Sequence, residues 1–401
     1  MPIETFEDFV KRVLEIVFWL LIFLPILVFP LIFIVIPYVI GLFGIMIPIP
    51  ITPNDLFVAV LDPIKGLPLI LESFKSPFFR IAVFPGFTWA ALLATGVILI
   101  ERKLLAKMQL RVGPLYAGKF EGVLQPIADL FKLMGKELVT PRAVDKPAFW
   151  AVPFATVAIA SALLAVIPVS EQWVIANIDV GLLVAFAIVG FFPIVALVAG
   201  WASNSKYPFL GGLRALHQMV AYEIPLLISA LGVALLAGTL NPVEIVRAQS
   251  SLWFILLQPI GAVVFFIAIL AELERIPFDL PEAETELVNG YLTEYGGMNF
   301  GLIQLGVYVK FYALAGLFTT LFLGGWYGPP ILPPAFAEAN AVIWFALKTL
   351  IVMIIMILPR GVVPRIRIDI MLRAGWSRLL LLSFLNIFIA MAVVQLGLFP
   401  R

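Results

Sequence analysis

Long apolar runs recur along the chain and are separated by shorter polar stretches. A helix needs about 20 consecutive apolar residues to cross the hydrocarbon core of a bilayer. The pattern therefore predicts an all-α integral membrane protein, with residues 1–401 forming a single membrane domain. Nine runs are long enough to predict transmembrane helices, namely Ile16–Val39, Ile81–Ile100, Phe149–Val169, Val180–Ala202, Met219–Leu240, Leu252–Ala271, Gly301–Leu323, Ala341–Leu358 and Leu379–Leu398.

The N-terminal region carries two further features. The first apolar run follows a charged start, but it lacks a small-residue cleavage site and is too long for a signal peptide. We therefore expect Ile16–Val39 to be retained as a helix. The stretch Ile47–Phe79 mixes apolar and charged residues with prolines, which predicts an amphipathic segment lying in the membrane interface.

Basic residues divide unequally between the two sets of connections. With a cytoplasmic N-terminus, 19 of the 26 Lys and Arg residues fall in the N-terminal segment and the inner loops, and only five fall in outer segments. Lys and Arg are enriched on the cytoplasmic side of membrane proteins, so an N-in, C-out orientation follows. The predicted cytoplasmic loops span residues 101–148, 203–218, 272–300 and 359–378.

Composition narrows the possible chemistry. Hydrophobic residues make up 62% of the chain and charged residues only 13%, which excludes a soluble protein of this length. Without cysteine the chain can hold neither a thiolate-ligated iron–sulfur cluster nor a disulfide, and its one histidine, His217, excludes a bis-His haem. A net charge of +1 argues against nucleic-acid binding. Redox chemistry would therefore need a cofactor on a partner or a diffusible carrier.

The loop at 272–299 is acidic, with seven Asp and Glu residues against one arginine. A helix following Pro281 would place Glu282 and Glu286 one turn apart on the same face. Carboxylates crowded beside an apolar medium have raised pKa values and can share protons, so the loop predicts a proton relay. The alternative is an ordinary solvated acidic face.

Three ionisable residues fall within or at the edge of predicted spans. Glu223 begins the fifth span, where it is either a functional carboxylate or an interfacial residue facing headgroups. Lys348 either serves a proton path or extends its ammonium to the interface, and it lies near the middle of a span, too deep to reach the interface easily. Lys310 lies within two turns of the end of its predicted span, so we expect its ammonium to reach the interface.

The polar loops favour a docking surface. The basic loop 101–148 and the acidic loop 272–300 are predicted on one side of the membrane, and the chain has no convincing internal repeat of the kind seen in transporters. Taken alone, the basic run after the second span indicates an anchor to anionic lipid. Together the loops indicate a platform for a cytoplasmic partner.

Five stretches, read together, resemble one family, the membrane component called subunit 1 or the H subunit of respiratory complex I (NADH:quinone oxidoreductase). They occur in the family's order over about three hundred residues. These are ERKLLAKMQLRVGP (101–114), QPIADLFKLMGKE (125–137), SNSKYPFLGGLRALHQMVAYE (203–223), ELERIPFDLPEAETELVNGYLTEYGGMNF (272–300) and PRIRIDIMLRAGW (364–376).

The resemblance implies a function and a set of partners. Members of the family dock a hydrophilic redox arm, form much of a quinone chamber and link quinone reduction to proton translocation through antiporter-like and small membrane subunits. Quinone is then the substrate, iron–sulfur clusters, and flavin if one is present, lie on partner subunits, and this chain binds no cofactor or metal. The expected location is the plasma membrane of a prokaryote, with the large loops cytoplasmic.

The resemblance also assigns residues. The proton-coupling carboxylates would be Glu223, Glu272, Asp279, Glu282, Glu284 and Glu286. The residues lining the quinone chamber or docking the arm would be Arg102, Arg111, Asp129, Arg275, Phe278 and Arg365.

Two positions depart from the family pattern. Many relatives carry Ala-Glu-Tyr at the start of the seventh span, where this chain has Gly306-Val307-Tyr308. Glu274 stands where relatives often have a neutral polar residue, and we hypothesise that it partly compensates.

Two other functions are alternatives. Related membrane-bound hydrogenases and ferredoxin-linked complexes usually read P-x-D-N-P-x-T-H where this chain reads PFDLPEAE (277–284), which favours the quinone branch. A stand-alone secondary transporter would take up substrate without soluble partners, and the one-sided loops and lack of repeats oppose it.

Overall fold

Helices make up the regular structure of the part of the chain that the computed structural model describes, which is residues 77–118, 122–333 and 336–396. The predicted first span, Ile16–Val39, and almost all of the interfacial segment Ile47–Phe79 lie outside these residues. The helices are α5 (Pro77–Ala82), α6 (Phe87–Met108), α7 (Gln125–Gly135), α8 (Lys146–Leu164), α9 (Gly181–Val189), α10 (Phe192–Ala202), α11 (Lys206–Ala237), α12 (Pro242–Ala248), α13 (Phe254–Leu257), α14 (Pro259–Glu272), α15 (Glu284–Leu287), α16 (Gly297–Phe322), α17 (Ala337–Val362), α18 (Ile368–Arg373) and α19 (Leu380–Gln395).

Within the described residues, seven helical stretches are long and apolar enough to cross a membrane. Each overlaps a predicted span. They are Phe79–Met108, Lys146–Leu164, Gly181–Ala202, Lys206–Ala237, Gly297–Phe322, Ala337–Val362 and Ile368–Gln395. The all-helical prediction is confirmed for this part of the chain, while the total of nine spans and the orientation stay predictions.

The helices extend further into the predicted loops than the apolar pattern indicated. Helix α11 already begins at Lys206, so most of the segment 203–218, predicted as a cytoplasmic loop, is helical. Loop 359–378 is shorter than predicted, since α17 continues to Val362 and a helical stretch resumes at Ile368. Polar residues can continue a helix once its apolar face is packed, so hydrophobicity alone places helix ends poorly.

Two predicted spans are interrupted at prolines. The span at Val180–Ala202 consists of α9 and α10, with Pro193 in the first turn of α10, where its missing N–H needs no helical partner. The span at Leu252–Ala271 consists of the single turn α13 and the 14-residue α14, which begins at Pro259. Helix α14 is shorter than the roughly 20 residues that a straight crossing requires.

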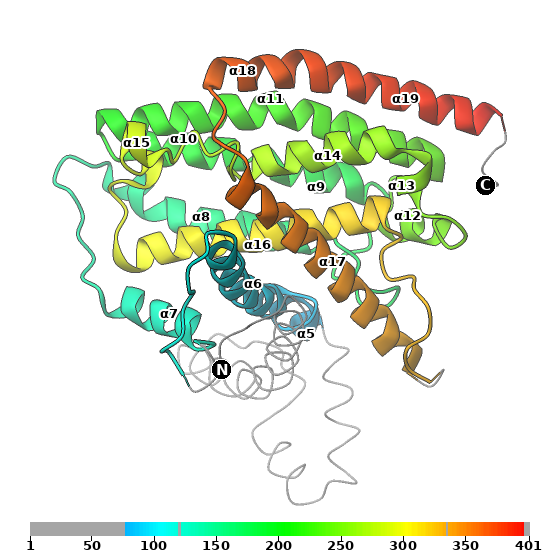
Figure 1. The fold of residues 1–401 in the computed structure, drawn as a ribbon, viewed down its shortest axis with the longest axis horizontal. Coiled ribbons are helices and arrows are strands. Elements are labelled where there is room, and N and C mark those ends of the chain that lie inside the picture. The colour runs from blue at the N-terminus through cyan, green and yellow to red at the C-terminus, as the bar shows by residue number, and fades with distance from the viewer. Residues whose placement is uncertain (1–76, 119–121, 334–335, 397–401) are drawn as a thin grey trace, which may run out of the picture.

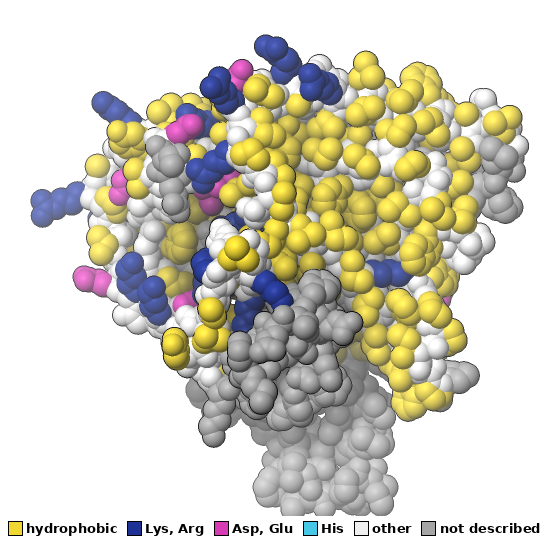
Figure 2. All heavy atoms as spheres, viewed as in Figure 1, with side chains coloured by type: hydrophobic (Ala, Val, Ile, Leu, Met, Phe, Trp, Pro, Cys, Tyr) yellow, Lys and Arg dark blue, Asp and Glu magenta, His cyan; other side chains and the backbone are white. Residues whose placement is uncertain are grey.

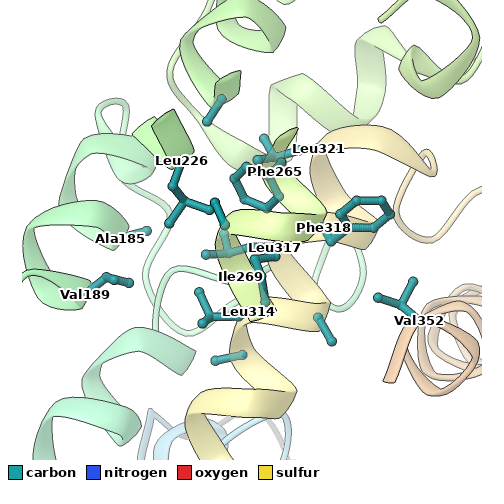
Figure 3. Packing of buried hydrophobic residues seen from close by; sticks show 14 of the residues in the cluster. Ala185, Val189, Leu226, Phe265, Ile269, Leu314, Leu317, Phe318, Leu321 and Val352 are labelled. Atoms are coloured by element: carbon teal, nitrogen blue, oxygen red, sulfur yellow. The ribbon is translucent and has the colours of Figure 1, made fainter. Parts of the chain in front are cut away.

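The core lies where α11, α14 and α16 meet. Helix α11 packs against α10, α14 and α19, and α16 packs against α6, α8 and α17. Figure 3 shows Phe265 and Ile269 of α14 between Leu226 of α11 and the α16 side chains, among them Leu317 and Phe318. The buried ionisable residues described below lie at one edge of this apolar packing.

Charged side chains gather at one end of the helix bundle. We call it the polar end; it is the end where α6 and α17 finish, at Met108 and Val362, and where α11, α16 and α18 begin. It lies to the left in Figure 1, and in Figure 2 most of the visible Lys and Arg side chains lie over it, while the opposite half is largely hydrophobic. Polar segments that are far apart in the sequence are thus brought together at one end of the folded chain.

Candidate functional site

A buried ion pair joins α14 to α16. Lys310 Nζ lies 2.8 Å from Glu272 Oε1 and also donates to the Glu272 carbonyl oxygen at 2.8 Å. The two side chains are only 3% and 1% exposed, and the ammonium lies 4.1 Å from the centroid of the Phe192 ring. Burial of either charge alone is strongly unfavourable, so each requires the other.

The position of Lys310 differs from the prediction. We expected its ammonium to reach the membrane interface, and that expectation is wrong. Helix α16 begins at Gly297 rather than Gly301, so Lys310 lies a full turn deeper in the helix than the apolar run indicated. Glu272 supplies the buried partner that makes this depth tolerable.

Glu223 of α11 lies close to this pair. Its half-buried carboxylate interacts electrostatically with both Glu272 and Lys310. It also packs against the break between α9 and α10, since a Cβ placed on Gly190 would lie 2.8 Å from Glu223 Oε1. Two carboxylates and one ammonium are thus brought together from α11, α14 and α16.

A second buried cluster surrounds Glu101, near the end of α6. Glu101 is 2% exposed and accepts hydrogen bonds from Arg275 at 2.8 Å, from Arg360, and from the Tyr308 hydroxyl at 3.1 Å. The Arg275 guanidinium lies over the rings of Tyr308 and Phe311, 5.3 and 4.2 Å from their centroids. This cluster ties α6, α16 and α17 to the segment that follows α14.

The segment between α14 and α16 holds two carboxylates that can change protonation near neutral pH. Glu274 is 8% exposed and accepts a hydrogen bond from the Tyr291 hydroxyl at 2.6 Å. Burial raises the pKa of Glu274 to about 7. Burial, together with the nearby charges of Glu274 and Asp279, raises the pKa of Glu282 to about 8.

The predicted helical pairing of Glu282 with Glu286 is wrong. Helix α15 begins at Glu284, so Glu282 precedes it and the two residues do not share a helix face. Glu286 is exposed and forms an ion pair with Arg214 of α11 at 2.5 Å. The side chain of Glu284 lies outside the described part of the structure.

The family resemblance assigns one set of residues to a quinone chamber or to docking of the redox arm. In the structure some of these residues lie on the surface and others lie in the interior. On the surface, Arg102 of α6 pairs with Asp129 of α7 at 2.5 Å. Arg111 is exposed, and its Nε donates to Gln109 at 2.8 Å. Arg275 belongs to the interior group through its pairing with Glu101.

Phe278 and Asp279 connect the same segment to its surroundings. Phe278 is 6% exposed and meets the ring of Tyr222 edge-on at a centroid distance of 5.2 Å. Asp279 accepts from Arg365, in the connection before α18, at 2.9 Å. Gln218 of α11 donates to the Phe278 carbonyl at 2.7 Å. These contacts hold the segment against α11 and the α17–α18 connection.

A small cavity lies beside the Glu272–Lys310 pair. The space available to water-sized molecules is about 30 Å³, and the ionisable residues in its lining are Glu272, Glu274, Tyr291 and Lys310. Val307 of α16 also lines it. The position that the family resemblance would fill with a carboxylate therefore faces the same cavity as Glu274.

Several members of this site were not predicted as site residues. In the sequence Glu101 is only the first letter of a motif, no pattern marks Tyr291, and Glu274 stands out only as a departure from the family pattern. The one signal in the sequence was local: Glu101 is a charge at the end of a long apolar run, as Glu223 is a charge at the edge of another. Burial and pairing of Glu101 depend on contacts across more than a hundred residues, which no sequence window contains.

Comparison with known proteins places the chain in a family. The family model described as NADH dehydrogenase matches residues 81–391. The H subunit of NADH-quinone oxidoreductase from Bacillus thuringiensis (strain Al Hakam) is 47% identical over 319 residues, covering 80% of this chain and 94% of the relative. The proteins of the same name from Bacillus cereus (strain AH187) and Bacillus anthracis (strain A0248) match over the same shares with the same identity.

The matched region contains every element from α6 to most of α19, and with it the two buried clusters and the acidic segment between α14 and α16. The chain therefore belongs to the family of NADH-quinone oxidoreductase H subunits, the membrane subunits also known as subunit 1 of respiratory complex I.

Proposed function

We propose that this chain couples quinone reduction to proton translocation within a complex I-type assembly, as its quinone-chamber and arm-docking subunit. The observation that supports this most strongly is a series of buried and half-buried carboxylates. The series extends from the interior of the helix bundle to the polar end. Glu223 and the Glu272–Lys310 pair lie among the helices, and Glu274 and Glu282 follow in the adjoining segment. Ionisable residues held at this depth mark proton and ion pathways in membrane proteins.

The protonation chemistry of the segment supports coupling. Because the pKa of Glu274 is about 7 and that of Glu282 about 8, each carboxyl can both take up and release a proton at neutral pH. Charge introduced nearby, as when a quinone takes electrons and protons, would change the proton affinity of these carboxyls. Glu272 would then respond through the shared electrostatic field, with Lys310 holding its carboxylate in place.

The polar end supports docking of a hydrophilic arm. Arg102 and Arg111 are exposed there. Helix α7 beside them exposes large apolar side chains, with Phe131 67% and Met134 59% accessible. Apolar residues exposed among charged ones are typical of protein interfaces. The proposed partners are the redox-arm subunits that carry the iron–sulfur clusters, and any flavin, together with the other membrane subunits.

The quinone is proposed from the resemblance and from the relatives, which are named NADH-quinone oxidoreductase subunits. Without cysteine, this chain cannot supply a thiolate-ligated cluster, so its own contribution is to position the quinone and to move protons. The proposed location is a prokaryotic plasma membrane, with the polar end facing the cytoplasm.

The test uses the assembled complex reconstituted in proteoliposomes. Glu223→Gln, which removes the titratable group and keeps the side-chain volume, should reduce quinone-linked proton pumping by about 100-fold while the complex still assembles. Glu282→Gln combined with Glu286→Gln should have a comparable effect. Glu244→Gln, an exposed carboxylate in the first turn of α12, is the matched control.

Proton pumping and quinone reduction are measured together, by a pH-sensitive dye and by quinone absorbance. Full quinone reduction with undiminished pumping in both test variants would rule out the coupling role. Loss of pumping in Glu244→Gln as well would show that the effect is not specific to this series of carboxylates.

A further inference from the structure

The cavity beside the Glu272–Lys310 pair is large enough to hold water. A water molecule needs a polar cavity of at least about 10–15 Å³ and two to four hydrogen-bonding partners. The cavity offers about 30 Å³, and Glu272, Glu274, Tyr291 and Lys310 are among the residues that line it. Most of the lining is apolar, so water would be held there by the polar groups of these four residues.

Two buried carboxylate oxygens have no hydrogen-bond partner here among the residues that the structure describes. Glu272 binds Lys310 through Oε1, and its Oε2 has no partner within the described part of the chain. Glu274 binds Tyr291 through Oε2, and its Oε1 likewise has no partner among the described residues. Both side chains are more than nine-tenths buried and both line the cavity. Buried polar atoms are nearly always satisfied by protein or by ordered water, and here the cavity is the space in which water can satisfy them.

The backbone presents Glu274 in an unusual conformation. Its φ of +52° lies in the left-handed region, which glycine, asparagine and aspartate tolerate better than glutamate does. The turn is fixed on one side by α14 and on the other by Arg275, which is locked onto Glu101. The surrounding structure therefore holds an unfavoured residue in place, which is a mark of functional positions.

We propose that Glu274 is a proton-carrying residue of the coupling path and that water in this cavity joins its carboxyl to that of Glu272. This role rests on the proposed coupling function. In one transfer, the Glu274 carboxyl gives its proton to water and the same water chain delivers a proton to Glu272 Oε2. The Glu274 carboxylate is then reprotonated from the direction of Glu282, so no proton is created or consumed.

The placement of Val307 gives the proposal a sharp test. Val307 lies on α16 and lines the same cavity, so a glutamate there could carry its carboxyl into the space that Glu274 serves. Glu274→Gln should reduce proton-coupled quinone turnover of the reconstituted complex by about 100-fold. The double variant Glu274→Gln with Val307→Glu should recover most of that loss. Glu294→Gln, in the same segment but not in the cavity lining, is the control and should match the unaltered complex.

A second experiment alters the proton affinity of Glu274 without removing its carboxyl. The groups that face Glu274 are Tyr291, Lys310, Glu272, Asp279 and Glu282. Because the hydrogen bond from Tyr291 lowers the pKa of Glu274, Tyr291→Phe should move the Glu274-dependent limb of the pH–rate profile to higher pH by about one unit, with turnover retained. A purely structural role for Glu274 would lower turnover without moving this limb.

The results of these experiments distinguish the role of Glu274 from the broader coupling function proposed for the chain. If Glu272→Gln abolishes coupling but Glu274→Gln pumps normally, the role of Glu274 is overturned and the proposed function stands. Failure of Val307→Glu to rescue, or an unmoved pH limb in Tyr291→Phe, would overturn the cavity relay. If neither Glu223→Gln nor Glu272→Gln affects coupling, the proposed function itself is wrong.

Discussion

At the scale of single residues, charge inside the helix bundle is held in tight groups. Glu272 is matched by Lys310, and Glu101 by Arg275 and Arg360, all with short contacts. Such pairs contribute little net stability, because desolvation offsets most of the attraction. The presence of these ion pairs in the interior is better explained by where they hold the carboxylates. Each pair fixes a carboxylate at a place where its charge acts on neighbouring groups.

The raised pKa of Glu282 makes stability depend on pH. Its folded-state pKa is about 8, against an ordinary value of 4.5, so between these values the folded protein binds more protons than the unfolded chain. Stability from this group is fully present below pH 4.5 and is lost as pH rises through about 8. Glu282→Gln should therefore reduce the loss of thermal stability between pH 6 and pH 9.

This prediction is measured as the unfolding temperature of the detergent-solubilised complex across that pH range. Glu286→Gln is the matched control, because Glu286 is an exposed carboxylate paired with Arg214 in the same segment. If the unfolding temperature depends on pH equally in Glu282→Gln and in the unaltered protein, the raised pKa of Glu282 is contradicted.

At the scale of helices, interruptions bring the ionisable residues together. The end of α9 places Gly190 against the Glu223 carboxylate, and the end of α14 places Glu272 against Lys310. Lys348 of α17 shows the same principle elsewhere, since its ammonium donates to the carbonyls of Leu323 and Tyr327 just beyond the end of α16. Helix ends leave carbonyls unpaired, and a buried ammonium satisfies them.

Gly190→Ala tests this arrangement without changing any charge. The added Cβ would lie 2.8 Å from Glu223 Oε1, and the far end of a flexible side chain can move aside. The φ of Gly190, −61°, is compatible with alanine. We therefore expect normal assembly and thermal stability, with proton-coupled turnover reduced about tenfold by displacement of the carboxylate.

Gly135→Ala is the corresponding control, because nothing lies within 4 Å of a Cβ at that position among the residues that the structure describes. Turnover should be measured per assembled complex, so that expression differences do not contribute. Unchanged turnover in Gly190→Ala would indicate that the placement of Glu223 against the helix break is unimportant.

At the scale of the whole molecule, the separation of charge along the helix bundle predicts where a partner binds. Arg111→Glu reverses an exposed charge at the polar end, and should weaken retention of the soluble arm. Arg247→Glu makes the same reversal at the other end of the bundle, next to the exposed Glu171 with which Arg247 pairs. The arm should remain bound to that variant.

Native gel electrophoresis after purification in mild detergent measures this retention, and raised salt should reduce the difference between the two variants, because salt screens exposed charges. Equal retention of the arm in the two variants would remove Arg111 from the docking surface.

The apolar pattern by itself determined the class of the fold, since hydrocarbon admits helices with internally paired backbones and the runs are long enough to form them. The sequence motifs also determined the family, and they named Glu223, Glu272 and Glu282 as candidates. These features are local, because a span or a motif is contained in its own stretch of chain.

Tertiary structure alone decided where helices begin and end and which charges meet. Residue spacing placed Lys310 at an interface and Glu282 on a helix with Glu286, and both predictions were wrong because helix ends depend on packing. The pairing of Glu272 with Lys310, the cluster around Glu101, and the cavity shared by Glu274 and Val307 join residues from different helices. Burial and neighbouring charges together set the proton affinity of such groups, and both arise only once the chain has folded.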